Sequence, residues 1–123
     1  MIHPRVLIVD DEEDIRSLMA SILRMHGYQV DLAADGAAAL ALLRDGSHPA
    51  LILLDLMMPG VNGWELLDQL HADAKLRTIP VVLVSGAGDL ETRAVSLGAA
   101  GYLRKPFDLE SLVAAVSSGF RDR

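Results

Sequence analysis

The chain has 123 residues, a formal net charge of −6 and no cysteine. This length is typical of one domain, and a composition of 51% apolar and 23% charged residues excludes intrinsic disorder. The negative charge disfavours binding to DNA or RNA, and the lack of cysteine excludes disulfides and thiolate chemistry. No apolar run is long enough for insertion into a membrane, and the first residues lack the pattern of a secretory signal, so we expect a cytoplasmic protein.

The first predicted elements are a strand, a helix and a second strand. Residues 6–9 form an uninterrupted apolar run, which is typical of a strand covered on both faces in a parallel sheet. A helix follows and ends near Gly27, which suits the C-terminal cap position. Residues 30–33 alternate between apolar and polar, as an edge strand does. The apolar face expected for this first helix consists of Ile15, Leu18, Met19, Ile22 and Leu23.

The middle of the chain repeats this alternation. Asp35 suits the N-cap of a helix over residues 36–44, which are rich in alanine and leucine. Residues 51–54 are a second uninterrupted apolar run and predict another buried strand. A third helix is predicted to begin at Asn62, with Glu65 close to the position of a capping box. Its expected apolar residues are Leu66, Leu67 and Leu70.

The last third predicts two more strands, each followed by a helix. The strands are residues 81–84 and 101–104, and a short helix between them ends at Gly98. The final helix begins after Asp108, and we expect residues 118–123 to be a frayed tail. The residues of this final helix that we expect to be buried are Leu109, Leu112, Val113 and Val116. Alternating strands and helices with short connections predict a single α/β domain, a doubly wound parallel sheet of five strands with five helices.

Polar residues follow the predicted strands at the points where the strands end. Asp10 and Asp11 follow the first strand, Asp55 the third and Ser85 the fourth, while Lys105 follows the fifth. Because the carboxyl ends of parallel strands meet at one edge of a sheet, these side chains are expected to converge. Taken singly, Asp11 could equally be a helix N-cap, and a lone Ser or Lys is usually a solvated surface residue.

The convergence of these residues has a chemical meaning. Three neighbouring carboxylates repel one another unless a cation is present, and hard oxygen donors suit Mg²⁺. An aspartate beside a metal can act as a nucleophile towards a phosphoryl group, and Lys105 and Ser85 could contact its oxygens. The residues therefore indicate Mg²⁺-dependent phosphoryl chemistry.

The chain resembles the receiver domain of two-component response regulators, including the chemotaxis regulators, from about Arg5 to Ser117. The resemblance rests on several short motifs that occur in the same order and at compatible spacing. These are Val6 to Glu12, Leu53 to Gly60, Asn62-Gly63, Ser85-Gly86, Gly98-Ala99 and Tyr102 to Phe107. The resemblance implies a flavodoxin-like fold with strand order 2-1-3-4-5.

The resemblance also implies a role for each site residue. Asp55 is similar to the family's phosphoacceptor, which takes a phosphoryl group from a phosphohistidine of a sensor histidine kinase or phosphotransfer protein. Asp10, Asp11, Asp55 and the backbone carbonyl of Met57 are implied to hold Mg²⁺. Lys105, in an implied cis peptide with Pro106, pairs with the phosphoryl group, while Ser85 and Tyr102 are implied to move as a switch.

The chain departs from the family pattern in three places. Ser85 stands where threonine is commoner, and the stretch from Ser85 to Tyr102 is slightly shorter than usual. Ala100-Gly101 precedes Tyr102, where the receivers of winged-helix transcription factors usually carry two acidic residues. We therefore expect a protein target downstream rather than direct nucleic acid binding, with a weak homodimer as a further expectation.

Two other functions compete with the receiver. A Mg²⁺-dependent phosphatase of the haloacid dehalogenase type also uses a strand-end aspartate, but it needs a second aspartate two residues later. Met57 occupies that position here, which argues against an enzyme acting on a separate substrate. A pseudo-receiver, which binds partners without phosphorylation, usually lacks one of the acids or the lysine, and this chain has them all.

Overall fold

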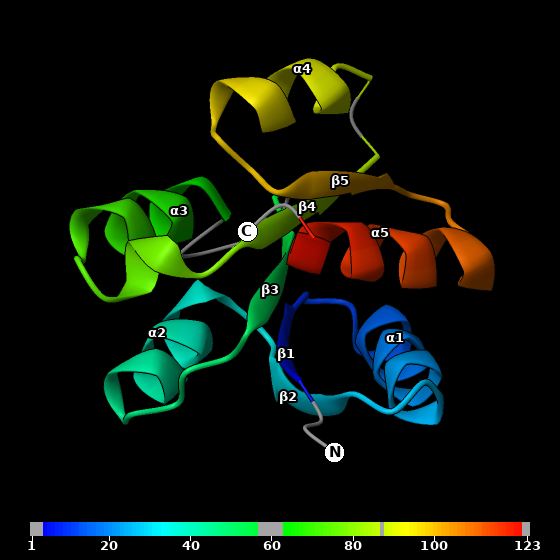
Figure 1. Ribbon diagram of the computed structural model, residues 1–123, viewed down its shortest axis with the longest axis horizontal. Helices are drawn as coiled ribbons and strands as arrows, with labels where there is room; N and C mark the ends of the chain where they lie inside the picture. Colours follow the sequence, from blue (N-terminus) through cyan, green and yellow to red (C-terminus); the bar gives the residue numbers. More distant parts are fainter. Residues whose placement is uncertain (1–3, 57–62, 87, 122–123) are drawn as a thin grey trace.

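The computed structural model describes residues 4–56, 63–86 and 88–121, and a parallel five-stranded sheet lies at its centre (Figure 1). The strand order is β2-β1-β3-β4-β5, as the resemblance implied, and β2 is an edge strand, as its alternating pattern predicted. The strands are β1 (Arg5–Val9), β2 (Gln29–Ala33), β3 (Leu51–Asp55), β4 (Val81–Ser85) and β5 (Gly101–Arg104).

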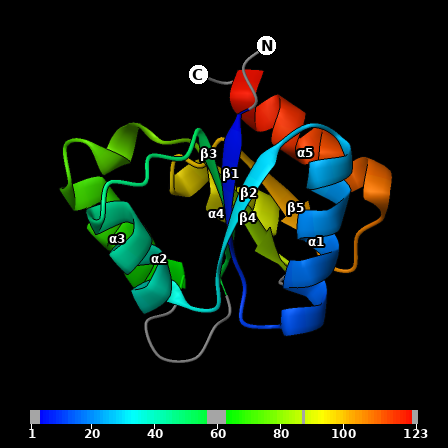
Figure 2. The ribbon, with the colours of Figure 1, turned by 90° about the horizontal axis from the view of Figure 1, so that it is seen from below.

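Helices cover both faces of the sheet, which confirms the doubly wound architecture. The helices are α1 (Glu13–Met25), α2 (Gly36–Arg44), α3 (Gly63–Ala72), α4 (Leu90–Ser96) and α5 (Leu109–Arg121), with a short 3₁₀ helix η1 (Leu76–Thr78). Figures 1 and 2 show α1 and α5 together on one face, with α2 and α3 on the other. The buried residues of α4 belong to the same core cluster as those of α2 and α3. No helix in the described part of the chain is both long and apolar enough to cross a bilayer.

The residues of β1 contribute to two hydrophobic cores, one on each face of the sheet. Val6 and Ile8 belong to the cluster that packs against α1 and α5, whereas Leu7 and Val9 belong to the cluster beneath α2 and α3. Successive side chains of a strand point to opposite faces, so a strand between two helical layers must be apolar at every position. This requirement explains the uninterrupted apolar runs of β1, β3 and β4.

Several predicted helix ends are confirmed by their local geometry. The Asp35 carboxylate accepts a hydrogen bond from the backbone N–H of Ala38 at 2.8 Å, which makes Asp35 the N-cap of α2. Gly27 and Gly98 have φ values of 91° and 68° after α1 and α4, a conformation that glycine adopts without strain. The prediction that α3 begins at Asn62 falls outside the described residues.

Two leucines expected in the core are exposed. Leu18 of α1 is 52% exposed because Met19, Ile22 and Leu23 already fill the contact between α1 and the sheet. Leu109 is 44% exposed because it is the first residue of α5. Leu112, about one helical turn later, is fully buried. Both errors arise because periodicity predicts the side of a helix but not the width of the surface that it covers.

The expected frayed tail over residues 118–123 is wrong for residues 118–121, which continue α5. Gly119 is buried, and a Cβ placed there would lie 2.5 Å from Leu51 Cδ1. Phe120 stacks on Tyr28, with ring centroids 5.8 Å apart and planes at 8°. The end of α5 therefore packs against the sheet and the start of β2.

Candidate functional site

The strand-end residues predicted to converge do so at the carboxyl edge of the sheet. Asp10, Asp55 and Ser85 are 0%, 3% and 1% exposed, whereas Asp11 is exposed beside them. The parallel register pairs Val9 with Leu54 and Asp55 with Val84, so these strand ends lie nearly level with one another. One carboxylate oxygen from each of Asp10, Asp11 and Asp55 lies within 4.8 Å of the others.

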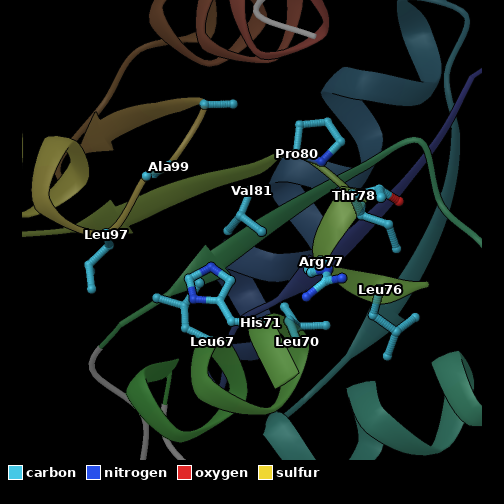
Figure 3. A pocket seen from close by; sticks show the side chains of 13 residues that line it. Leu67, Leu70, His71, Leu76, Arg77, Thr78, Pro80, Val81, Leu97 and Ala99 are labelled. Atoms are coloured by element: carbon cyan, nitrogen blue, oxygen red, sulfur yellow. The ribbon is translucent and has the colours of Figure 1, made fainter. Parts of the chain in front are cut away.

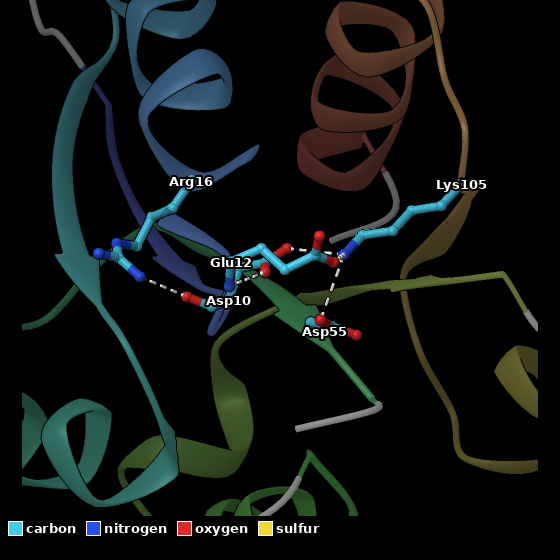
Figure 4. Close-up of polar contacts among 5 residues, drawn as sticks. All are labelled: Asp10, Glu12, Arg16, Asp55 and Lys105. Atoms are coloured by element: carbon cyan, nitrogen blue, oxygen red, sulfur yellow. Dashed lines mark hydrogen bonds and ion pairs between the residues drawn. The ribbon is translucent and has the colours of Figure 1, made fainter. Parts of the chain in front are cut away.

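Lys105 reaches this cluster from the segment that follows β5 (Figure 4). Its Nζ lies 3.0 Å from Asp10 Oδ2, 3.2 Å from Glu12 Oε1 and 3.2 Å from Asp55 Oδ2. Its peptide bond with Pro106 is cis, as the resemblance implied. Burial by itself lowers the pKa of Lys105, but the hydrogen bond to Asp10 and the charges of Asp55 and Asp10 outweigh it and raise that pKa above its usual range. Lys105 is therefore a positioned cation at physiological pH.

Two residues that the sequence analysis did not single out hold Asp10 and Lys105 in place. The backbone N–H of Glu12 donates to Asp10 Oδ1 at 2.9 Å, and the Glu12 carboxylate contacts Lys105. The Arg16 guanidinium donates to the backbone carbonyl of Asp10 at 2.8 Å. Glu12 could have been noticed as a third acid next to the pair, whereas nothing in the local pattern distinguishes Arg16 from any exposed helical arginine.

A close backbone approach supports the end of β3. A Cβ at Gly63, the first residue of α3, would lie 2.6 Å from the carbonyl oxygen of Asp55 and 2.7 Å from Leu56 Cα. Only glycine allows α3 to begin this close to the strand that carries Asp55. The motif Asn62-Gly63 was noted as part of the resemblance, but its steric reason is visible only in the fold.

Ser85 and Tyr102 occupy positions that differ in exposure. Ser85 is buried at the end of β4, and its carbonyl accepts a hydrogen bond from the backbone N–H of Lys105 at 2.9 Å. Tyr102 lies on the edge strand β5 and is 40% exposed. The predicted ligand Met57 falls outside the described residues.

The donor set of the site fits a hard divalent cation. Asp10 and Asp55 are buried, Asp11 is exposed, and all three offer carboxylate oxygens to one small volume. The neighbouring Lys105 contributes one positive charge, so the cluster as a whole is anionic. Mg²⁺ prefers carboxylate oxygens and retains several waters, which suits a site that is open on the side of Asp11.

Comparison with known proteins assigns a family to this arrangement. The family model of the response regulator receiver domain matches residues 6–117. The DNA-binding dual master transcriptional regulator RpaA of Synechocystis is 38% identical over 120 residues, which cover 96% of this chain and 49% of RpaA. Protein PilH of Pseudomonas aeruginosa is 38% identical over 117 residues, which cover 93% of this chain and 95% of PilH. The chain thus spans about half the length of RpaA and nearly all of PilH.

Solved structures agree with this assignment. The chemotaxis response regulator CheY4 of Vibrio cholerae superposes with a TM-score of 0.87 at 29% identity, covering 96% of this chain and 99% of CheY4. NtrX of Brucella abortus superposes with a TM-score of 0.87 at 34% identity, covering 98% of this chain and 27% of NtrX. The fold and the order of its strands are therefore those of these regulators.

Proposed function

Because this chain belongs to the family of response regulator receiver domains of two-component systems, we propose that it is a phosphorylation-controlled switch in which Asp55 is the phosphoacceptor. Receiver domains are signalling domains rather than enzymes that act on a separate substrate. The observation that carries the proposal is the placement of Asp55, buried at the end of β3 with Lys105 on one oxygen and two further carboxylates beside it. Among the described residues Asp10 shares these neighbours, but its Oδ1 is also held by the backbone N–H of Glu12 at 2.9 Å.

In the proposed reaction, a carboxylate oxygen of Asp55 attacks the phosphorus of a phosphohistidine on a sensor kinase or phosphotransfer protein. The new P–O bond forms as the P–N bond breaks, and the imidazole leaves with the electron pair. Asp10, Asp11, Asp55 and the Met57 carbonyl would hold Mg²⁺, which when bound neutralises charge on the transferring oxygens. Lys105, released in part from Asp55, pairs with a phosphoryl oxygen.

The switch is proposed to couple the pocket to an outer face. The Ser85 hydroxyl would donate to the phosphoryl oxygen, and Tyr102 would turn inward as Ser85 moves. A phosphoryl dianion can shift the balance between two packings only by interacting better with one of them, and Ser85 and Lys105 supply that difference. The face formed by α4, β5 and α5 would then bind a downstream protein, while the net charge of −6 disfavours direct nucleic acid binding by this domain.

Labelling with acetyl phosphate and Mg²⁺ tests the phosphoacceptor. Intact-mass measurement should show the gain of one phosphoryl group, which EDTA or the substitution Asp55→Asn abolishes. Asp68→Asn, which removes an exposed carboxylate of α3, is the matched control and should label like the parent. Absence of labelling would support a pseudo-receiver, and turnover of acetyl phosphate without a labelled protein would support a phosphatase.

Amide spectra of the free and beryllofluoride-bound protein test the switch. Shifts are expected both around Asp55 and on β5 around Tyr102, and Ser85→Ala should suppress the second set more than the first. Shifts confined to the pocket would contradict the proposed coupling.

A further inference from the structure

We propose that a cavity at the opposite edge of the sheet from Asp55 binds a small organic carboxylate with an apolar body. The cavity has a volume of about 430 Å³ and lies among α3, η1 and the starts of β4 and β5 (Figure 3). Small-molecule sites typically have volumes of roughly 300–1,000 Å³. The site shares no residue with the phosphoacceptor cluster.

The buried residues that line this cavity are apolar, whereas its polar side chains are exposed. Leu67 and Leu70 of α3 and Val81 of β4 are buried residues that line it, and Leu97 lines it from the end of α4. Pro80 also lines the cavity, and its backbone has no N–H donor. Such a surface favours an aromatic or aliphatic group of matching size.

Two basic side chains stand at the same cavity. His71 projects from α3 and Arg77 from η1, and among the described residues neither has a hydrogen-bond or ion-pair partner for its side chain. None of the residues lining the cavity is an aspartate or glutamate, although the chain contains 17 of them. A guanidinium can bind a carboxylate through two parallel hydrogen bonds, and an imidazole can donate one more. The charge of the site therefore selects an anionic ligand.

The backbone around the cavity favours a small molecule over a peptide. The N–H groups of Gly98, Ala99 and Ala100 already donate to Val95, Ala94 and Val81. The Thr78 hydroxyl donates to the carbonyl of Lys75 at 2.9 Å. These donors are therefore not available to the carbonyls of an extended peptide, which leaves an anionic group beside an apolar body as the ligand that the cavity favours.

A titration with 1-naphthoate, followed by amide spectra of the full chain, tests the site. Saturable shifts are expected at Gly98, Ala99 and Ala100, with a dissociation constant on the order of 1 mM for a probe of about 13 non-hydrogen atoms. The neutral analogue 1-naphthamide should bind at least about fivefold more weakly. Arg77→Gln should weaken naphthoate binding about tenfold, the scale of a lost charged hydrogen bond, and should leave the rest of the spectrum unchanged.

Arg44→Gln is the matched control, since Arg44 is an exposed arginine of α2 that does not line this cavity. It should bind naphthoate like the parent. The proposal is overturned if no saturable shift occurs, if the shifts map away from residues 97–100, or if the amide binds as well as the acid. Equal weakening by Arg44→Gln and Arg77→Gln would also overturn it, because it would indicate general attraction to basic residues.

Discussion

The partners of Lys105 differ in how firmly they hold it. Asp10 and Asp55 have side chains that are 0% and 4% exposed, whereas the Glu12 side chain is 59% exposed. Ion pairs with exposed partners contribute little to stability and exchange easily with solvent. Under the proposed function, Glu12 is therefore the contact that Lys105 would give up most easily, and it would compete with an incoming phosphoryl group for Lys105.

The substitution Glu12→Gln should strengthen binding of beryllofluoride at Asp55 by a few-fold. It removes a competitor for Lys105 and a negative charge near the incoming anion, each worth about 0.2–1 kcal/mol for an exposed pair. Titration by amide spectra measures the effect, with Glu13→Gln on α1 as the control. Weaker binding in Glu12→Gln would show that Glu12 instead positions Lys105 for the anion.

Asp11 is the acid whose charge should be easiest to remove. Asp10 accepts hydrogen bonds from Lys105 and from the backbone of Glu12, and Asp11 is exposed. Asp11→Asn should therefore stabilise the metal-free protein by about 0.5 kcal/mol through relief of like-charge repulsion, while impairing phosphorylation. Urea denaturation with EDTA and with Mg²⁺ measures both effects. A lower midpoint than the parent's without metal, or an undiminished response to Mg²⁺, would contradict the assignment.

At the scale of elements, the contact between α3 and the end of β3 depends on one glycine. A Cβ at Gly63 would meet backbone atoms, which cannot rotate away, whereas a Cβ at Gly88 would meet nothing within 4 Å. A side chain at position 63 would therefore clash with the backbone, whereas a side chain at position 88 would not.

Gly63→Ala should destabilise the protein by about 1–3 kcal/mol, the usual cost of overpacking, although alanine is the better helix former. It should also reduce phosphorylation of Asp55, because α3 or the end of β3 must shift. Gly88→Ala should change neither property. Chemical denaturation and acetyl phosphate labelling of both variants measure this, and a stabilised Gly63→Ala would exclude the close approach.

The start of α5 is stabilised by the carboxylate of Asp108. This side chain accepts a hydrogen bond from the backbone N–H of Ser111 at 2.7 Å, and that bond holds the pKa of Asp108 below its usual range. A depressed carboxyl pKa means that the stabilisation is complete above the unfolded-state pKa of about 3.9 and is lost as the pH falls through the folded-state value.

Carbon-detected titration of the carboxyl group should therefore give a midpoint below that of a model aspartate. The amide resonance of Ser111 should move with the same midpoint, and Asp108→Ala should lower the Tm at neutral pH. A midpoint at or above about 3.9 would contradict the cap.

At the scale of the whole molecule, the two faces of the sheet are closed by separate core clusters. On the face of α1 and α5, the last turn of α5 contacts the segment between α1 and β2 through Phe120 and Tyr28. Aromatic stacking of this kind contributes about 0.5–1.5 kcal/mol beyond the burial of area. The end of α5 should therefore contribute to the stability of the entire domain.

Phe120→Ala should destabilise the domain by about 1–3 kcal/mol, less than the roughly 3–5 kcal/mol of a fully buried phenylalanine because Phe120 is partly exposed. Leu109→Ala is a control in the same helix and should have a much smaller effect, since Leu109 is 44% exposed. Thermal and urea unfolding measure both variants. Equal effects would indicate that the last turn of α5 frays in solution.

The sequence by itself determined the alternation of strands and helices, the residues at the strand ends and the family. Hydrophobic periodicity, capping residues and glycines are local signals, and the topology rules for parallel sheets place strand ends together without any coordinates. Asp10, Asp55, Ser85 and Lys105 were therefore predictable as one cluster.

Only the tertiary structure decided which groups touch and how deeply each is buried. The contact of Glu12 with Lys105 joins residues 93 positions apart, and the approach of α3 to β3 is set by packing at Gly63. The exposure of Leu18 and the docking of residues 118–121 likewise depend on how wide a surface the sheet offers each helix. Such properties follow from the packing of distant segments at close to crystal density, which no local pattern in the chain encodes.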